Sequence, residues 1–311
     1  INAGKSKIPL IAKTPISILT REILQYAKNI DEAIAIAKKR KVFVSESIMV
    51  GSAADRKAIL IEVSPDNFGV YEVPNSNNQL ICTNHFQSDT FKNNNRNLYQ
   101  IENSHSKYRY ERLVELFDEN PKINPQIAAN ILRDREGLKN LPLGYGNEKA
   151  LNQLLAHHGV IFKPEQRLVW VSGNPYQLGE FVCYDLNKIF KNRIPGNPIV
   201  SMQQENLNIA KDPFIETEAY KNYEKFRVED RKMDAFLENK MGLTTDFAKN
   251  YQSLNRNYWV VYYKVGLFYY QNKQYGLAQQ DFELALTKEI TTLPERHAIE
   301  KYLKKIKRKL Q

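Results

Sequence analysis

The hydrophobic pattern of the first eighty residues predicts two helices followed by a run of strands. Thr14 and Pro15 are typical of a helix start, and apolar residues then recur at helical spacing up to Ala27. Asp31 is the expected N-cap of a second helix, which ends at Lys39. Apolar, β-branched runs separated by turn-forming residues then predict an antiparallel meander with strands at 42–50, 58–63, 69–73 and 79–83.

The next hundred residues mix both kinds of element. The Asn-rich cluster 93–97 is expected to be an exposed loop, and the segments 106–117 and 125–135 have helical spacing. Further apolar runs predict strands at 167–172 and 180–184. Helices, a strand meander, helices and more strands in this order predict an α+β body built in layers.

The composition of the chain and its predicted structure change after Phe190. Residues 192–213 are rich in Pro, Gly and Asn and are typical of a linker or wrapping loop. The rest is helical, and one stretch follows the spacing of a tetratricopeptide repeat, with a third helix expected from Pro294: Tyr262, Val265, Gly266, Tyr269, Ala278, Phe282 and Ala285. We therefore divide the chain into a body at 1–205 and an all-α, helical-repeat-like unit at 206–311. Because one repeat is too few to fold alone, we expect this unit to dock on the body or on a partner, including a second copy of the chain.

Composition narrows the class of partner. The formal net charge is +10, and residues 300–311 hold six Lys or Arg against one Glu. A nucleic-acid surface would interleave basic and aromatic residues over a folded face, so this basic end favours a solvated helix terminus. No apolar run reaches the length needed to span a bilayer, and localisation stays open. Cys82 and Cys183 are not spaced as metal ligands, and we expect a buried, inert thiol at each. The sequence also contains no phosphate-binding or dinucleotide-binding motif. We therefore expect no cofactor and no metal.

The sequence offers half of an acyl-transfer site. An apolar run, 80–82, leads into Thr83, Asn84 and His85, and the amide of Asn84 is suited to donate to a developing oxyanion. Arg109, in the segment Ser-x-x-Arg-Tyr, supplies a permanent cation. The alternatives are an Asn that only ends a strand and an Arg on a solvated helix face. We assign Asn84 and Arg109 to catalysis, and Thr83, His85 and His158 to substrate binding.

Taken together, several segments resemble the acyl-CoA:6-aminopenicillanate acyltransferase-like branch of the choloylglycine hydrolase superfamily. They are 80–86, 106–112, 45–55, 58–64, 144–146, 157–158 and 167–172. The resemblance implies an N-terminal-nucleophile hydrolase with a four-layer αββα sandwich, which acts through an acyl-enzyme on linear C–N amides of the N-acyl amino acid, bile-salt or penicillin type, or on acyl thioesters. It also implies a nucleophilic cysteine, released by autoproteolysis, whose own α-amino group is the base.

Residue 1 of this sequence is Ile, which has no nucleophilic atom. We therefore expect the sandwich to be incomplete at its N-terminus, the nucleophile segment to lie upstream of Ile1, and residues 1–311 alone to be inactive. The alternative is a chain that does no chemistry and serves as a helical-repeat binding or assembly module. The choice between hydrolase and acyltransferase stays open at this point.

Overall fold

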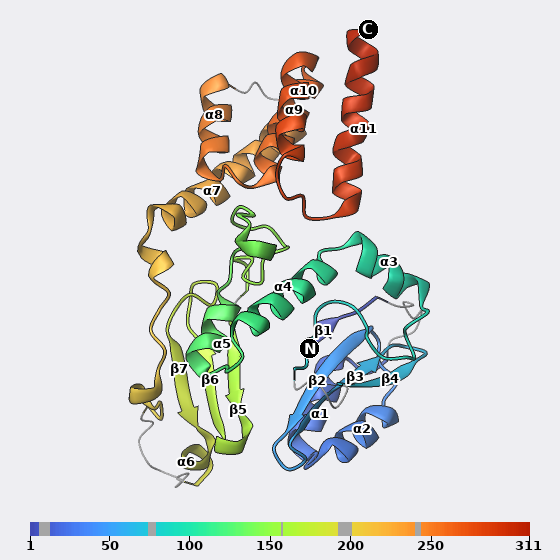
Figure 1. Ribbon diagram of the computed structural model, residues 1–311, viewed down its shortest axis with the longest axis vertical. Coiled ribbons are helices and arrows are strands. Elements are labelled where there is room, and N and C mark those ends of the chain that lie inside the picture. The colour runs from blue at the N-terminus through green and yellow to red at the C-terminus, as the bar shows by residue number, and fades with distance from the viewer. Residues whose placement is uncertain (6–12, 74–78, 157, 192–200, 240–243) are drawn as a thin grey trace. The chain divides into compact units, whose positions relative to one another are not determined.

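The computed structural model describes residues 1–5, 13–73, 79–156, 158–191, 201–239 and 244–311 (Figure 1). It has α+β character, as the sequence predicts. The chain forms two compact units, one of residues 1–118 with 162–168 and the other of residues 119–161 with 169–311. The division expected after residue 205 does not coincide with these units and stays a prediction about functional domains, as does the αββα layering.

The first unit is built on a four-stranded antiparallel sheet with strand order β1-β2-β3-β4. The strands are β1 (Asn2–Ala3), β2 (Glu46–Ser52), β3 (Lys57–Val63) and β4 (Phe68–Glu72). Four helices belong to the same unit: α1 (Ile16–Tyr26), α2 (Ile30–Lys39), α3 (Asn95–Asn103) and α4 (Ser106–Glu119).

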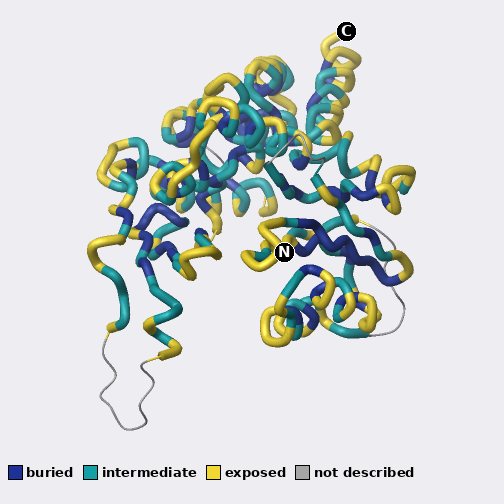
Figure 2. Tube along the Cα trace, turned by 60° about the horizontal axis from the view of Figure 1, so that its bottom comes forward, coloured by how far each residue is buried: buried dark blue, intermediate teal, exposed yellow. Residues whose placement is uncertain are grey.

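One face of this sheet packs on α1 and α2. Alternate residues of β3, Ile59 and Ile61, are fully buried in a cluster with Leu19 and Ala33 of the two helices. Each fully buried aliphatic side chain of this kind stabilises the fold by about 1.5–3 kcal/mol. The residues between them point to the other face, and Leu60 and Glu62 are also 0 % exposed, so β3 is covered on both sides (Figure 2).

The second unit contains most of a three-stranded sheet of order β5-β6-β7. Its strands are β5 (Val160–Lys163), β6 (Leu168–Ser172) and β7 (Phe181–Asp185). Residues 162–168, which include the end of β5 and the start of β6, are grouped with the first unit. Its helices are α5 (Pro125–Leu132), α6 (Leu186–Lys191), α7 (Glu218–Asn239), α8 (Thr245–Leu254), α9 (Trp259–Gln271), α10 (Tyr275–Leu286) and α11 (Leu293–Leu310). Leu154 and Leu178 share a hydrophobic core with side chains of α7, α8 and α9. The C-terminal helices therefore pack on the segment that precedes them.

Several boundaries differ from the sequence-based expectations. Helix α1 follows Pro15, because Thr14 bridges to Val42, and α2 is capped by Asn29, whose side chain accepts from the amide of Glu32. The cluster expected as a loop at 93–97 instead starts α3, since the side chain of Asn94 accepts from the amides of Arg96 and Asn97. Strand β5 was not predicted. The last correction is the most important for function: residues 79–83 form no strand and run irregularly.

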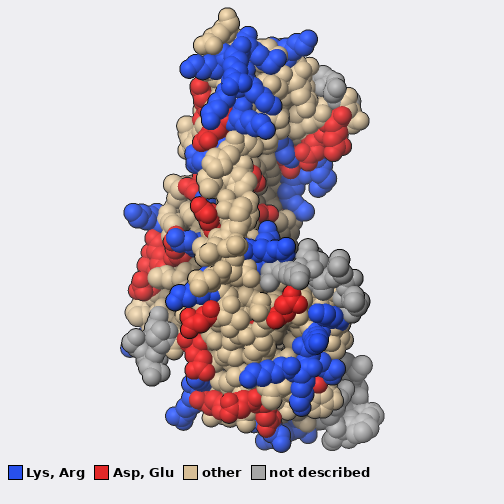
Figure 3. All heavy atoms as spheres, turned by 90° about the vertical axis from the view of Figure 1, so that its right-hand side faces the viewer, with Lys and Arg blue, Asp and Glu red and all other residues tan. Residues whose placement is uncertain are grey.

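The basic C-terminus forms the last turns of α11, and its lysines and arginines gather on one face of the molecule (Figure 3). Three of them, Lys307, Arg308 and Lys309, lie in the last turn, where the helix dipole favours cations. Within the described ranges, no helix combines the length and apolar character needed to cross a bilayer.

We predict that Phe282→Ala lowers the free energy of unfolding by about 3–5 kcal/mol, because a buried aromatic leaves a cavity when truncated. Phe282 is 0 % exposed, and its ring lies 3.0 Å from where a Cβ on Gly266 would stand, so α9 and α10 are in close contact. Urea unfolding measures the change. Gln280→Ala, at an exposed position of the same helix, is the control and should change stability by less than about 0.5 kcal/mol. Equal, small effects of both variants would show that the helix pair is loosely packed.

Candidate active site

The segment that carries Thr83, Asn84 and His85 lies on the sheet face opposite α1 and α2. One row of residues crosses all four strands in direct register on this face: Asn2 pairs with Ser47, Ser47 with Glu62 and Glu62 with Gly69. Three of the four are polar, although the strands around them are apolar. A polar row inside a sheet needs hydrogen-bond partners above it. The 81–88 segment supplies them for Asn2 and Glu62, whereas the buried hydroxyl of Ser47 has no partner among the described residues.

Glu62 is the main anchor of this segment. Its carboxylate accepts hydrogen bonds from the amides of Gln87 and Ser88, at 2.6 and 2.9 Å, and from the Ser88 hydroxyl at 2.6 Å. Burial raises the pKa of Glu62, and the hydrogen bonds from Ser88 and Gln87 oppose that effect. Gly69, the next member of the row, leaves room for Ser88, whose hydroxyl stands 2.3 Å from where a Cβ on Gly69 would be.

Asn2, at one end of the row, and a side chain of helix α3 complete the support. Asn2 donates to the carbonyl of Cys82 at 2.8 Å. Asn97 of α3 is 1 % exposed and binds both backbone groups of Phe86, accepting from its amide at 2.8 Å and donating to its carbonyl at 3.1 Å. These backbone groups are satisfied by side chains and not by a neighbouring strand, which explains why 79–83 is not the strand that its apolar residues predict.

Asn84 and Arg109 are in direct contact, as expected for two parts of one site. The Nη2 atom of Arg109, on α4, donates to Oδ1 of Asn84 at 2.6 Å, and Nδ2 of Asn84 donates to the carbonyl of Ala3 at 3.1 Å. Arg109 also contacts Nδ1 of His105 at 2.9 Å. An amide nitrogen carries two hydrogens, so Nδ2 of Asn84 keeps one that no described residue accepts. The contact with Arg109 fixes which side of the amide carries that donor.

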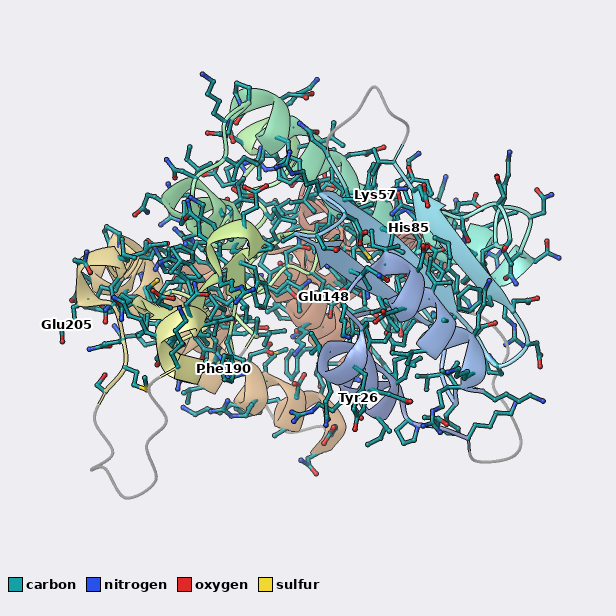
Figure 4. The ribbon with its side chains drawn as sticks, turned by 90° about the horizontal axis from the view of Figure 1, so that it is seen from below. Tyr26, Lys57, His85, Glu148, Phe190 and Glu205 are labelled. Atoms are coloured by element: carbon teal, nitrogen blue, oxygen red, sulfur yellow. The ribbon has the colours of Figure 1, made fainter. Side chains whose placement is uncertain are left out.

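Thr83 and His85 form a cluster with Ser106. Nδ1 of His85 lies 3.1 Å from the hydroxyl of Thr83 and 2.8 Å from that of Ser106, and the two hydroxyls are 3.1 Å apart. His85 is 8 % exposed, and Figure 4 shows it at the sheet of the first unit. Burial, followed by the positive charges of Arg109 and Lys107, lowers the pKa of His85 to about 4. The imidazole is therefore neutral at pH 7.

The side chains around Asn84 offer no activated nucleophile. Ser106 contacts His85, but it is 0 % exposed, less than Thr83 at 4 % and His85 at 8 %, and its hydroxyl is hydrogen-bonded to both. Burial raises the pKa of the Cys82 thiol, the opposite of what a reactive cysteine needs. The described residues also hold no cluster of His, Cys, Asp or Glu suited to a metal ion.

One sequence-predicted site residue lies outside the first unit. His158 belongs to the second unit, so its assignment to substrate binding stays a prediction, and its neighbour His157 lies outside the described residues. Arg112, one turn after Arg109, is 1 % exposed and pairs with Glu115 at 2.8 Å, a structural ion pair.

A comparison with known families gives a match. A model of the family described as acyl-coenzyme A:6-aminopenicillanic acid acyl-transferase matches residues 1–174, more than half of the chain. The chain belongs to this acyl-transferase family. No curated protein and no solved structure matches it. The family match contains the whole Asn84 cluster, and membership indicates acyl-transfer or amidase chemistry as the general class of activity. The helical-repeat resemblance lies outside the matched residues and stays a prediction.

Sequence reasoning missed three residues that support the Asn84 cluster. Glu62 carried a signal, because a carboxylate in the apolar run 58–63 is costly unless donors surround it. Ser106 and Asn97 carried none, since ordinary polar residues on helices are mostly solvated. Only the fold places them under the 81–88 segment.

Replacing Glu62 tests whether it anchors the site. We predict that Glu62→Gln lowers the free energy of unfolding by about 1–3 kcal/mol, because one oxygen that accepts an N–H becomes a donor itself. Hydrogen exchange at the amides of Gln87 and Ser88 should become faster in the same variant. Glu72→Gln is the control: Glu72 lies on the adjacent strand with its side chain 51 % exposed and should change stability by less than about 0.5 kcal/mol. Unchanged exchange at both amides would show that Glu62 does not hold the segment.

The buried imidazole of His85 predicts a pH dependence of stability. The folded pKa lies below the unfolded value of 6.5, so the unfolded state binds the proton first as pH falls. This contribution is fully present above pH 6.5 and is lost between pH 6.5 and 4, at about 1.4 kcal/mol per pH unit. Urea unfolding of the wild type and His85→Gln at several pH values should show a difference in stability that changes by this slope. A difference that is independent of pH contradicts the neutral, buried assignment.

Proposed function

We propose that this chain contributes the oxyanion-stabilising half of a cysteine N-terminal-nucleophile acyl-transfer site. The observation that supports it best is the Asn84–Arg109 contact, in which a guanidinium orients an amide and leaves one N–H free to donate. A carbonyl oxygen of the substrate would accept that N–H, and the bond would strengthen as the oxygen becomes negative in the tetrahedral intermediate.

The nucleophile in this proposal is a cysteine of a preceding segment, with its own α-amino group as the base. Its thiolate attacks the carbonyl carbon of a linear C–N amide or an acyl thioester, the amine or thiol leaves with a proton, and an acyl-enzyme forms. Water or an amine then takes the acyl group, which makes the protein a hydrolase or an acyltransferase. The substrate classes that we propose, on the basis of the family resemblance, are N-acyl amino acids, bile-salt amides and penicillin-type amides.

In this mechanism Arg109 is a positioning residue that acts through Asn84. Burial lowers the pKa of His85 most, and the charge of Arg109 lowers it further. The neutral imidazole and the Thr83 hydroxyl stand beside Asn84 in sequence and are suited to bind a polar group of the substrate, as is His158 if it reaches the same substrate. No cofactor takes part in the proposed chemistry.

The pair predicts a specific mutational pattern in the protein assayed together with its cysteine segment. Asn84→Ala should lower kcat about a hundredfold or more, as loss of one oxyanion donor does elsewhere. Arg109→Met should lower kcat less, and the double variant should be no slower than Asn84→Ala, because Arg109 acts only through Asn84. Hydrolysis of N-acyl amino acids and penicillin-type amides provides the assay.

Two controls make the result interpretable. Asp118→Asn, at an exposed position of the same helix, should leave kcat unchanged. Residues 1–311 alone should show no turnover. Turnover by this chain alone, or strictly additive effects of the two substitutions, would refute the missing nucleophile or the role of Arg109, respectively.

A further inference from the structure

A cavity of about 860 Å³ lies within the second unit, remote in sequence from Asn84 and its partners. Its walls come from α5, from the segment 133–145, from 210–214 and from the end of α8 with the turn that follows. Many of these residues lie beyond residue 174, outside the family match. The volume is within the usual range for sites that bind small molecules.

The cavity wall is fixed by buried hydrogen bonds. Asn255 is 4 % exposed, and its side chain accepts from the amide of Tyr145 at 3.0 Å and donates to the carbonyl of the same residue at 2.8 Å. Gly144 has φ +78°, and a Cβ there would lie 2.3 Å from the backbone nitrogen of Tyr258. The loop is thus held against the turn after α8, which gives a ligand a preformed surface.

Two arginines lie in the wall, and one of them pairs with a carboxylate. Arg133 is 5 % exposed and donates only to backbone carbonyls, those of residues 177–179 and 210, and no described carboxylate forms an ion pair with it. Arg135 pairs with Asp212 at 2.8 Å. Asp134 and Glu136 also line the cavity, and so do two solvent-exposed cations, Lys211 and Arg256. The lining holds four cations and three carboxylates, and Lys211 pairs with Glu216 outside it, so these charges balance. Arg133 is nevertheless a buried cation that an anion would stabilise.

Arg135 presents free donors to this space. Its guanidinium lies 4.0 Å from the ring centre of Phe214, and Nη1 makes both of its hydrogen bonds, to Asp212 and to the carbonyl of Arg133. Nε and Nη2 have no partner among the described residues. The hydroxyl of Tyr145 likewise has no hydrogen-bond partner among the described residues. The centre of its ring lies 5.0 Å from that of Phe214. A guanidinium edge and a phenol hydroxyl are suited to hold a carboxylate.

The remaining lining suits an amide and an apolar side chain. Asn222 and Asn257 line the cavity, and their amide groups make no hydrogen bond within the described residues. Each offers a donor and an acceptor, which match the two halves of a peptide bond. Leu143 and Leu254 add apolar surface.

We propose that this cavity binds a small molecule that carries a carboxylate next to an amide, with its carboxylate on Arg135 and Tyr145. Two sources share this chemistry: an N-acyl amino acid and the C-terminal residues of a short peptide. The site is distinct from the Asn84 cluster and does not rest on the acyl-transfer proposal.

Binding of defined probes to the full 311-residue chain tests the proposal. The probes are N-acetylphenylalanine and trialanine, each as the free acid and as the C-terminal amide, measured by isothermal titration calorimetry. At least one free acid should bind at least tenfold more tightly than its amide, and the preferred acid tells the two sources apart. Arg135→Gln should weaken binding of the acid at least tenfold and leave that of the amide unchanged. Tyr145→Phe, which keeps the ring, should weaken the acid severalfold.

Arg231→Gln is the matched control, since Arg231 is an exposed arginine of α7 that does not line the cavity. It should bind all probes as the wild type does. Circular dichroism checks that each variant is folded. If Arg135→Gln does not fold, the acid–amide comparison on the wild type and the Tyr145→Phe variant decide. The proposal is overturned if neither acid binds, if acid and amide bind equally, or if the folded variants bind the acid as tightly as the wild type does.

Discussion

A carboxylate in the middle of a buried strand needs hydrogen-bond donors, and Glu62 finds three of them on one short segment. Two are backbone amides, so the interaction constrains the path of the chain and not only a side chain. The cost of burying the charge is offset only while Gln87 and Ser88 keep their places. The sheet thereby fixes the segment that starts at Thr83, and Asn97 fixes it a second time through both backbone groups of Phe86.

The same support explains how a half-buried asparagine acquires a defined orientation. An amide on an irregular segment would normally turn freely between its two orientations. Here Arg109 occupies the oxygen of Asn84, and the carbonyl of Ala3 takes one of the two N–H donors. A donor that is oriented before the substrate arrives stabilises a developing oxyanion without further rearrangement. The proposed oxyanion role of Asn84 depends on this orientation.

The second unit raises a different point about charge. Arg133 and Arg135 are two residues apart, yet they differ in hydrogen bonding. Arg133 donates to backbone carbonyls, whereas Arg135, which lines the cavity, has donors without a partner among the described residues. Part of that cavity's wall comes from residues after 174, so the family match does not account for it. The C-terminal helices also share a core with Leu154 and Leu178, which makes them part of this unit's stability.

The sequence alone was enough for the family, the α+β class and most helices, because these depend on local spacing and on residue types with specific chemistry. It also singled out Asn84 and Arg109, which the structure brings into contact. It predicted a strand at 79–83, since apolar β-branched residues favour one, and it placed a loop where Asn94 caps α3. The tertiary structure decided otherwise because the backbone groups of 81–88 are satisfied by Asn2, Glu62 and Asn97, residues distant in sequence. Whether a polar group is paired depends on what the fold brings above it, and local pattern carries no information on that.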